Sequence, residues 1–223
     1  MDVVEAINKR KSIRAFKPDP VPQTILKEII EVALRAPSWG NSQPWDFVIV
    51  AGSKLDEIKQ GFSEKAGQES TLDIARPQEF PEPYGSRRRG LAVRPPQTTE
   101  VRTGNVNRRP QNPRFFGAPY VIYICTGRSL YFQSKGINSW PIFDCGAIEE
   151  NIMLLATNYG LGTIALAQSV TYPDVIRKVI EIPDSLLIVV GIAIGYPDWT
   201  DPVNQRQSAR EPLVQVAKWH GFD

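Results

Sequence analysis

Three cations and a hydroxyl lie within five residues near the N-terminus, in the run Arg10-Lys11-Ser12-Ile13-Arg14. A phosphate monoester carries nearly two negative charges, and guanidinium groups can meet it with paired hydrogen bonds. The hydroxyl of Ser12 adds a further donor. The same run is also typical of a basic helix end, where cations complement the helix dipole and bind no ligand. The residues alone therefore predict either a phosphate-binding segment or a plain helix terminus.

A second polar segment, Pro37–Gln43, directly precedes the apolar run Phe47–Val50. Asn41 and Gln43 each offer a donor and an acceptor in one plane, which matches the mixed edge of a planar heterocycle. Trp39 adds a flat apolar surface for a ring system. Ordinary turn chemistry after a helix is the alternative. Taken with the basic run, the loop indicates a nucleotide-like cofactor, for which flavin mononucleotide (FMN) is the best candidate.

Several motifs follow one another in an order and spacing that resemble the FMN-dependent nitroreductase family, and its nitrobenzoate-reductase-like members in particular. The resemblance covers most of the chain and leaves only the middle weakly matched. From the N-terminus the motifs are Arg-x-Ser-x-Arg at 10–14, Pro-Ser-x-x-Asn-x-Gln-Pro-Trp at 37–45, Asp-Cys-Gly at 144–146, Tyr-Gly-Leu-Gly-Thr at 159–163, Gly-Tyr-Pro-Asp at 195–198 and Arg-Glu-Pro-Leu at 210–213.

The resemblance implies which residues contact FMN. The expected cofactor-binding residues are Arg10, Lys11, Ser12, Arg14, Pro37, Ser38, Trp39, Asn41, Gln43, Leu166, Ala167, Gln168, Ser208 and Arg210. Arg14 would lie nearer the ring than the phosphate, and Ser208 and Arg210 would bind the phosphate. Ala167 and Gln168 would offer backbone N–H groups to flavin N5. The alternatives are a plain buried strand end at 166–168 and a solvated tail at 206–210. No catalytic acid or base and no metal ligand is expected, because the cofactor carries the redox step.

The activity that the resemblance implies is hydride transfer from NADH or NADPH through flavin N5 to a nitroaromatic or similar electrophilic aromatic compound. Donor and acceptor would use the same flavin face in turn, which gives a ping-pong mechanism. The enzyme would be a homodimer with FMN at the subunit interface, reached by the loop 37–43 of the partner. The same scaffold also hosts dehalogenases and flavin-dependent dehydrogenases, so these reactions remain alternatives.

The elements that must position these residues are predicted from hydrophobic period and from caps. A chain of 223 residues fits one domain, 1–223. The expected fold is α+β and nitroreductase-like, with a central mixed or antiparallel sheet flanked by helices, in an intertwined homodimer. Helices are expected at 2–9, 23–36, 54–66, 145–159 and 173–180, and strands at 46–51, 120–125, 163–167 and 186–194. Asp144 is the expected N-cap of the helix 145–159.

The middle of the chain, at about 76–114, is rich in arginine and proline and has little hydrophobic period. It is interpreted as an insert or lid with little regular structure, which helps to select an aromatic, anionic substrate. A different class of function is also open, because the run 87–109 could be a nucleic-acid-binding arm.

Composition narrows the remaining classes of function and of binding partner. The net charge of +2 does not call for a nucleic acid or a membrane partner, and neither is expected. Cys125 and Cys145 lie in apolar segments, which fits buried thiols in a reducing cytoplasm. The single histidine, His220, has no cysteine or carboxylate at ligand spacing, so neither a zinc site nor a Ser-His-Asp triad is expected.

Overall fold

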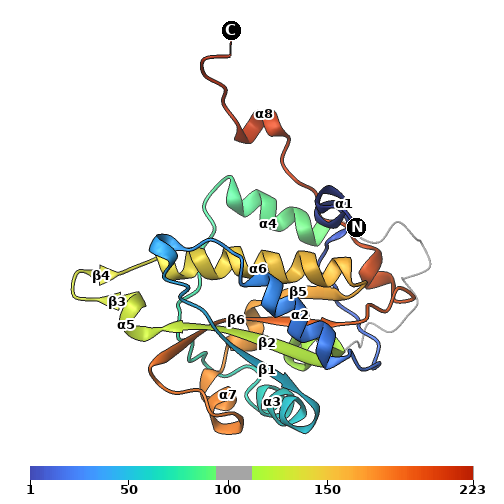
Figure 1. The fold of residues 1–223 in the computed structure, drawn as a ribbon, viewed down its shortest axis with the longest axis vertical. Helices are drawn as coiled ribbons and strands as arrows, with labels where there is room; N and C mark the ends of the chain where they lie inside the picture. Colours follow the sequence, from blue (N-terminus) through green and yellow to red (C-terminus); the bar gives the residue numbers. More distant parts are fainter. Residues whose placement is uncertain (94–111, 223) are drawn as a thin grey trace.

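A four-stranded antiparallel sheet forms the centre of the molecule, with its strands in the order β1-β2-β6-β5 (Figure 1). The computed structural model describes residues 1–93 and 112–222. The strands are β1 (Asp46–Ala51), β2 (Tyr120–Gly127), β5 (Gly162–Leu166) and β6 (Leu186–Gly195). β1 and β5 are thus the two ends of the sheet, and both lie next to segments that carry predicted site residues.

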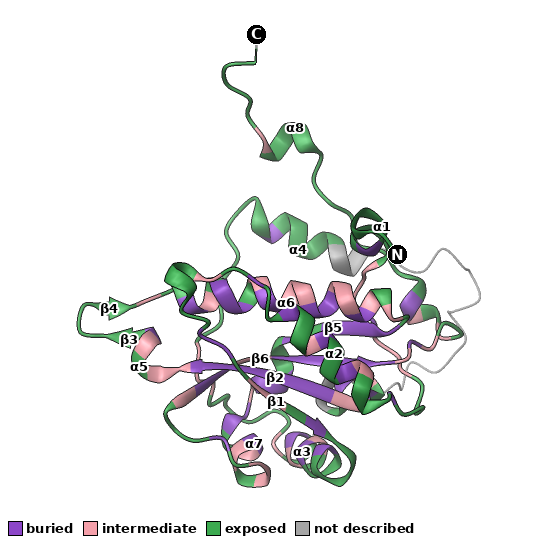
Figure 2. Cartoon of the chain, viewed as in Figure 1, coloured by how far each residue is buried: buried purple, intermediate pink, exposed green. Residues whose placement is uncertain are grey.

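Helices cover both faces of the sheet, so its inner strands are buried on each side. On one face lie α2 (Gln23–Ala33) and α6 (Trp140–Asn158), and on the other lie α3 (Gly52–Glu64) and α7 (Pro173–Val179). Successive side chains of β2 point to opposite faces of the sheet and so belong to two separate apolar cores. Ile122 packs in the core that contains Ile148 of α6, whereas Tyr123 packs in the core that contains Ile58 of α3. Figure 2 shows the buried residues concentrated on the strands and on the helix sides that face them.

The smaller elements lie around this sandwich. They are α1 (Val3–Lys9), α4 (Tyr84–Val93), α5 (Arg128–Tyr131), the hairpin of β3 (Phe132–Gln133) and β4 (Gly136–Ile137), and α8 (Leu213–Val216). Short 3₁₀ turns lie at η1 (Trp39–Asn41), η3 (Asn112–Gly117), η4 (Ala167–Val170) and η5 (Pro202–Gln205). After η5 the chain leaves the body of the molecule, and α8 stands apart from it (Figure 1).

The predicted α+β fold with helices on both faces of a sheet is confirmed, and the sheet is antiparallel throughout. The predicted strands all form, each within two residues of its expected ends. The helix expected at 2–9 forms with Asp2 as its N-cap, whose carboxylate accepts the Glu5 N–H at 2.8 Å. The helix expected at 23–36 is shorter, because it ends at Ala33 and passes into turns before Pro37.

Two expectations about helices are wrong. The long helix α6 begins at Trp140 rather than Cys145, since Pro141 is tolerated in the first turn of a helix. Asp144 therefore lies inside the helix and is not its N-cap. In the region expected to lack regular structure, Tyr84–Val93 forms α4. Residues 94–111 of the predicted insert lie outside the described residues.

Candidate active site

The basic run near the N-terminus lies along the edge of the sheet, next to β5. The Ile13 N–H donates to the Thr163 carbonyl at 2.9 Å, and Ser12 and Thr163 form a parallel bridge. Ile13 is almost fully buried against Gly162, where an added Cβ would come within 2.6 Å of the Ile13 Cγ1 atom. Only glycine allows this close approach. With Ile13 held inward, the segment that carries Arg10, Ser12 and Arg14 has a fixed position on the body of the protein.

A buried asparagine joins this segment to the chain after β6. The side-chain oxygen of Asn204 accepts the Arg14 N–H at 2.8 Å. Its amide nitrogen donates to the carbonyls of Ala15 and Asp198, each at 2.8 Å. Asn204 is 1% exposed and its hydrogen-bonding groups are used. It therefore holds two basic segments together, the one that ends at Arg14 and the one that begins at Arg206.

The cations at this junction are only partly neutralised, because Arg10 has a carboxylate partner and Arg14 has none among the described residues. Burial, and then the charge of Arg206, lower the pKa of Arg14 below its usual value. No carboxylate of the described residues forms an ion pair with Arg14, whose side chain reaches only the Ser12 carbonyl at 3.2 Å. Arg10, which is largely buried, lies 3.5 Å from the Glu150 carboxylate. Lys11 turns the other way, onto the Trp199 ring at 4.9 Å from its centre. Positive charge therefore gathers at Arg10 and Arg14.

The polar loop after α2 has an unusual backbone. Gly40, Asn41 and Gln43 have φ values of 58°, 56° and 45°, in the left-handed region. Two side chains stabilise these turns: the Ser38 Oγ accepts the Gln43 N–H at 3.0 Å, and the Asp144 carboxylate accepts the Trp39 N–H at 3.1 Å. Because the backbone takes up these contacts, the amides of Asn41 and Gln43 remain exposed on the loop.

The end of β5 supplies main-chain groups rather than side chains. Leu166 is 4% exposed and packs in the core, so its side chain is turned away from any ligand on the surface. Ala167 and Gln168 are exposed in η4. Arg76 braces this turn, donating to the Ala167 carbonyl and, at 2.8 Å, to the Thr171 hydroxyl.

The last two predicted residues lie on the segment that leaves the body. Arg210 donates to the Ser208 hydroxyl at 2.6 Å, so these two side chains contact each other. In the part of the chain that the structure describes, no hydrogen bond joins either of them to Arg10 or Ser12. The neighbouring Glu211 pairs with Arg87 of α4 at 3.1 Å. The structure thus brings Arg10, Ser12 and Arg14 together and leaves Ser208 and Arg210 on the tail.

Three residues that shape this site are absent from the predicted set: Asn204, Asp144 and Arg76. All three form hydrogen bonds with distant backbone: Asn204 with a residue 190 positions away, Asp144 with one 105 away and Arg76 with one 91 away. The Asp-Cys-Gly motif could have pointed to Asp144 as a site residue. No motif in the sequence marks Asn204 or Arg76.

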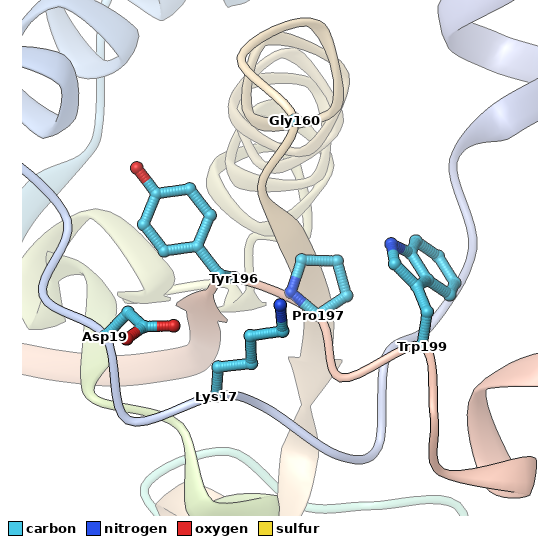
Figure 3. A pocket seen from close by; sticks show the side chains of 6 residues that line it. All are labelled: Lys17, Asp19, Gly160, Tyr196, Pro197 and Trp199. Carbon is cyan, nitrogen blue, oxygen red and sulfur yellow. The ribbon is translucent and has the colours of Figure 1, made fainter.

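A shallow pocket of about 330 Å³ lies nearby, lined by Lys17, Asp19, Gly160, Tyr196, Pro197 and Trp199 (Figure 3). These residues come from the N-terminal connection, the end of α6 and the loop after β6. One lysine and one aspartate line it, so it carries no net charge for an anion. Among the described residues, no group of His, Cys, Asp or Glu could hold a metal ion. No described helix is long and apolar enough to cross a membrane.

An antiparallel sheet between two helical layers carries a basic segment along its β5 edge and a polar loop at the start of α6, and together they make up this α+β structure. Residues 7–196 match the nitroreductase family, and the chain belongs to it. It is therefore an oxidoreductase, and the family expected from the motifs is confirmed.

Individual relatives extend this finding. Nitroreductase NfnB of Mycolicibacterium smegmatis is 27% identical over 96% of this chain and 90% of its own length. A 4-nitrobenzoate reductase of Nocardioides sp. is 27% identical over 93% of this chain and 85% of its own. Among solved structures, the FMN and NADPH-dependent nitroreductase NfnB from sphigopyxis sp. strain HMH is 28% identical, with a TM-score of 0.84 and 100% of both chains covered.

Proposed function

We propose that this protein binds FMN and uses NADH or NADPH to reduce a nitroaromatic or similar electrophilic aromatic compound. FMN, when bound, supplies a flavin N5 that takes up hydride from the nicotinamide and delivers it to the acceptor. The activities carried in the names of a 4-nitrobenzoate reductase and of an FMN and NADPH-dependent nitroreductase support this proposal.

One observation carries the proposal: Arg14, beside Ser12, has no carboxylate partner among the described residues. Arg14 is held by Asn204 next to Arg206, and its pKa is lowered by burial and by that second charge. Placing like charges together without a carboxylate costs free energy unless an anion offsets it. A phosphate monoester bound by Arg10 and Ser12, with Arg14 toward the ring, would supply that anion.

In the proposed homodimer, the polar loop of one subunit fits the ring end of the cofactor that its partner holds. The exposed amides of Asn41 and Gln43 offer both donors and acceptors, as the pyrimidine edge of a flavin requires. The loop backbone is fixed by Ser38 and Asp144, so these amides would bind with little ordering cost. On the opposite side, exposed Ala167 and Gln168 can present backbone N–H groups. In this arrangement the protein binds and orients the ring, and no side chain needs to act as a general base.

The uncovered apolar surface supports a homodimer with shared sites. Large side chains of α1 and of the tail are more than half exposed: Val3, Val4, Ile7, Leu213, Val214, Val216, Trp219 and Phe222. A single chain rarely leaves so many apolar side chains in water. β1 is also an open edge strand, with Ile49 44% exposed. A tail that docks on a second copy would cover this surface, over an interface of more than roughly 2,000 Å².

The arginine-rich segment has a narrower role than its composition predicts. Arg87 pairs with Glu211, and Arg89 pairs with Glu82. Arg88 lies over the Phe80 ring, 4.7 Å from its centre. These contacts place α4 against the tail. Of the three arginines 87–89, Arg88 is the one for which the described residues provide no carboxylate partner. We propose α4 as a cover that tunes substrate choice, rather than as a nucleic-acid-binding arm.

The absorbance spectrum of the purified protein tests the proposal directly. The expected result is a yellow protein with one FMN per chain, released intact on denaturation, together with nitroarene-dependent oxidation of NADPH or NADH. Both nicotinamides are assayed side by side, because the sequence does not decide between them. A colourless protein that takes up no added FMN would refute the proposal. Flavin uptake without nitroarene reduction would favour another flavin reaction, such as dehalogenation.

A further inference from the structure

Three large aromatic side chains form an uncovered cluster beside the polar loop. Trp39 lies on the loop, while Trp140 and Phe143 lie one turn apart at the start of α6. The ring centres of Trp39 and Trp140 are 4.6 Å apart at 31°, and those of Trp140 and Phe143 are 5.6 Å apart and edge-on. The three residues are 64%, 46% and 68% exposed in that order. Two indoles and a phenyl ring thus form one continuous apolar wall that opens to solvent.

This wall is held in shape by the backbone. Asp144, one turn further along α6 and 2% exposed, accepts the Trp39 N–H at 3.1 Å. Gly40 then takes a φ of 58°, which turns the chain directly after Trp39. The loop is therefore attached to α6 at the residue whose ring meets Trp140. Such a fixed aromatic surface can bind a ligand with little loss of side-chain conformational entropy.

The chemistry of the wall selects a class of ligand. Indole and phenyl faces carry negative charge in their π systems and stack favourably on rings that are poor in electrons. None of the three side chains carries a formal charge, so they offer no ion-pair partner to a carboxylate. A flat aromatic ring with a withdrawing group, such as a nitro group, fits this surface best. Aliphatic or bulky acceptors would gain little from it.

We propose that Trp39, Trp140 and Phe143 form the wall of the electron-acceptor site and select flat, electron-poor aromatic rings, with Asp144 as the residue that positions Trp39. This proposal rests on the proposed function, since it places the wall beside the loop that carries Asn41 and Gln43 to the flavin. It goes further by assigning acceptor selection to Trp140 and Phe143, which are not among the residues expected to contact FMN, together with Trp39.

Steady-state kinetics with two acceptors separate the wall from the cofactor site. In the FMN-loaded enzyme, Trp140→Ala and Phe143→Ala should each lower kcat/KM for a nitroarene by about tenfold, the scale of one lost aromatic contact. Reduction of ferricyanide, which has no ring to stack, should keep its rate, and FMN content should not change. Phe132→Ala on the β3–β4 hairpin is the matched control, because Phe132 is also about half exposed, at 47%.

Spectroscopy tests the positioning role without turnover. Two indoles at this separation should give a coupled near-ultraviolet circular dichroism signal, which Trp39→Phe and Trp140→Phe each remove. Asp144→Ala should weaken this signal and raise the KM for the nitroarene more than it lowers kcat. Asp144→Asn should restore both, because an amide oxygen can accept the same N–H. If the alanine variant does not fold, the asparagine variant still decides, since loss of the signal there would contradict the hydrogen-bonding role.

Failure of the proposed function and failure of the aromatic wall would give different results. A wild-type protein without FMN would refute the proposed function. An FMN-loaded enzyme whose nitroarene kinetics are unchanged in Trp140→Ala and Phe143→Ala, or change equally in Phe132→Ala, would overturn the aromatic wall alone.

Discussion

Residues 10–17 and residues 206–222 both carry arginines assigned to the FMN phosphate, yet the two segments are built in opposite ways. The first is hydrogen-bonded to β5, to Asn204 and to the Tyr196 carbonyl, and it buries Ile13. The second leaves the body with nearly every side chain exposed (Figures 1 and 2). We therefore expect one half of the proposed anion site to be complete in a single chain. The other half would need a surface to dock on, so in the proposed homodimer we expect cofactor binding to depend on assembly.

Deleting residues 212–222 should have the largest effect. The tail contributes several large exposed side chains, and each gains about 1.5–3 kcal/mol when it is buried on a partner. We expect the dimer dissociation constant to rise by at least about 1,000-fold, or 4 kcal/mol, with FMN lost in parallel. Sedimentation over a dilution series measures this effect. Lys218→Ala is the control for charge alone. A truncated chain that dimerises as tightly as the full one would contradict the docking role.

Removing the buried amide of Asn204 should have the second-largest effect. Asn204→Leu loses three hydrogen bonds and leaves the Arg14 N–H and the Ala15 and Asp198 carbonyls without this partner, at a cost of about 2–4 kcal/mol. We expect a lower urea midpoint together with loss of FMN. The neighbouring Gln205→Leu removes an exposed amide and should change neither. Retention of FMN at full stoichiometry in Asn204→Leu would show that the basic segment does not need this brace.

Single arginines on the two segments sharpen the comparison. Arg10→Ala and Arg210→Ala should each weaken FMN retention by about 1.5–3 kcal/mol, the scale of a charge-assisted hydrogen bond. Because Arg210 acts only when the tail is docked, its effect should shrink as the protein is diluted toward the monomer, whereas that of Arg10 should persist. Equilibrium dialysis of FMN at several protein concentrations measures both, with Arg35→Ala as control. Full FMN content in both variants would refute the phosphate assignment.

The pH dependence of stability should report on Glu149 of α6. Burial, and then the neighbouring Glu150, raise the pKa of Glu149 to about 7 from an ordinary 4.5. Between these values the folded protein holds a proton that the unfolded chain releases, so stability should fall as pH rises toward 7 and then level off. Glu149→Gln should remove this fall and stabilise the protein by about 1–2 kcal/mol at pH 8.

Urea unfolding at pH 5.5 and pH 8, at one fixed protein concentration, tests this prediction for Glu149. Glu31→Gln on α2 serves as the exposed control, since Glu31 lies beside Lys27 in solvent. A stability that rises between the two pH values in the unmodified protein would contradict the assignment.

The smallest effect is expected from the arginines of α4. Replacing Arg87, Arg88 and Arg89 with alanine should leave FMN content unchanged and raise the KM for an anionic nitroaromatic by a few-fold, about 0.5–1 kcal/mol, as for exposed charges. A neutral nitroarene is the control substrate. Kinetics that do not change, together with loss of measurable DNA or RNA binding, would instead support a nucleic-acid-binding role.

Much of the fold could be read from the sequence because its buried strands are uninterrupted apolar runs. β2 and β6 are such runs, and their positions were predicted within two residues. The helix α4 could not be found in this way. Its sequence carries three arginines and two glycines with almost no hydrophobic period, and the helix is held by contacts with Glu82 and Glu211.

The candidate site divides in the same way. Arg10, Ser12 and the loop 37–43 lie in short local motifs, which sequence can identify. The brace residues Asn204, Arg76 and Asp144 act on distant backbone, and their partners depend on how the sheet and helices pack. At Leu166 the sequence locates the strand end but does not reveal that this side chain points into the core.

The bond from Asn204 to the Arg14 backbone also has a consequence for biosynthesis. It joins residues 190 positions apart, so the N-terminal half of the anion site waits for nearly the whole chain to be made. Contacts of this length form late in folding, because a large loop must close first. A nascent chain would therefore be unable to capture its flavin on the ribosome. We therefore expect FMN loading to follow release of the chain and, in the proposed homodimer, its pairing with a second copy.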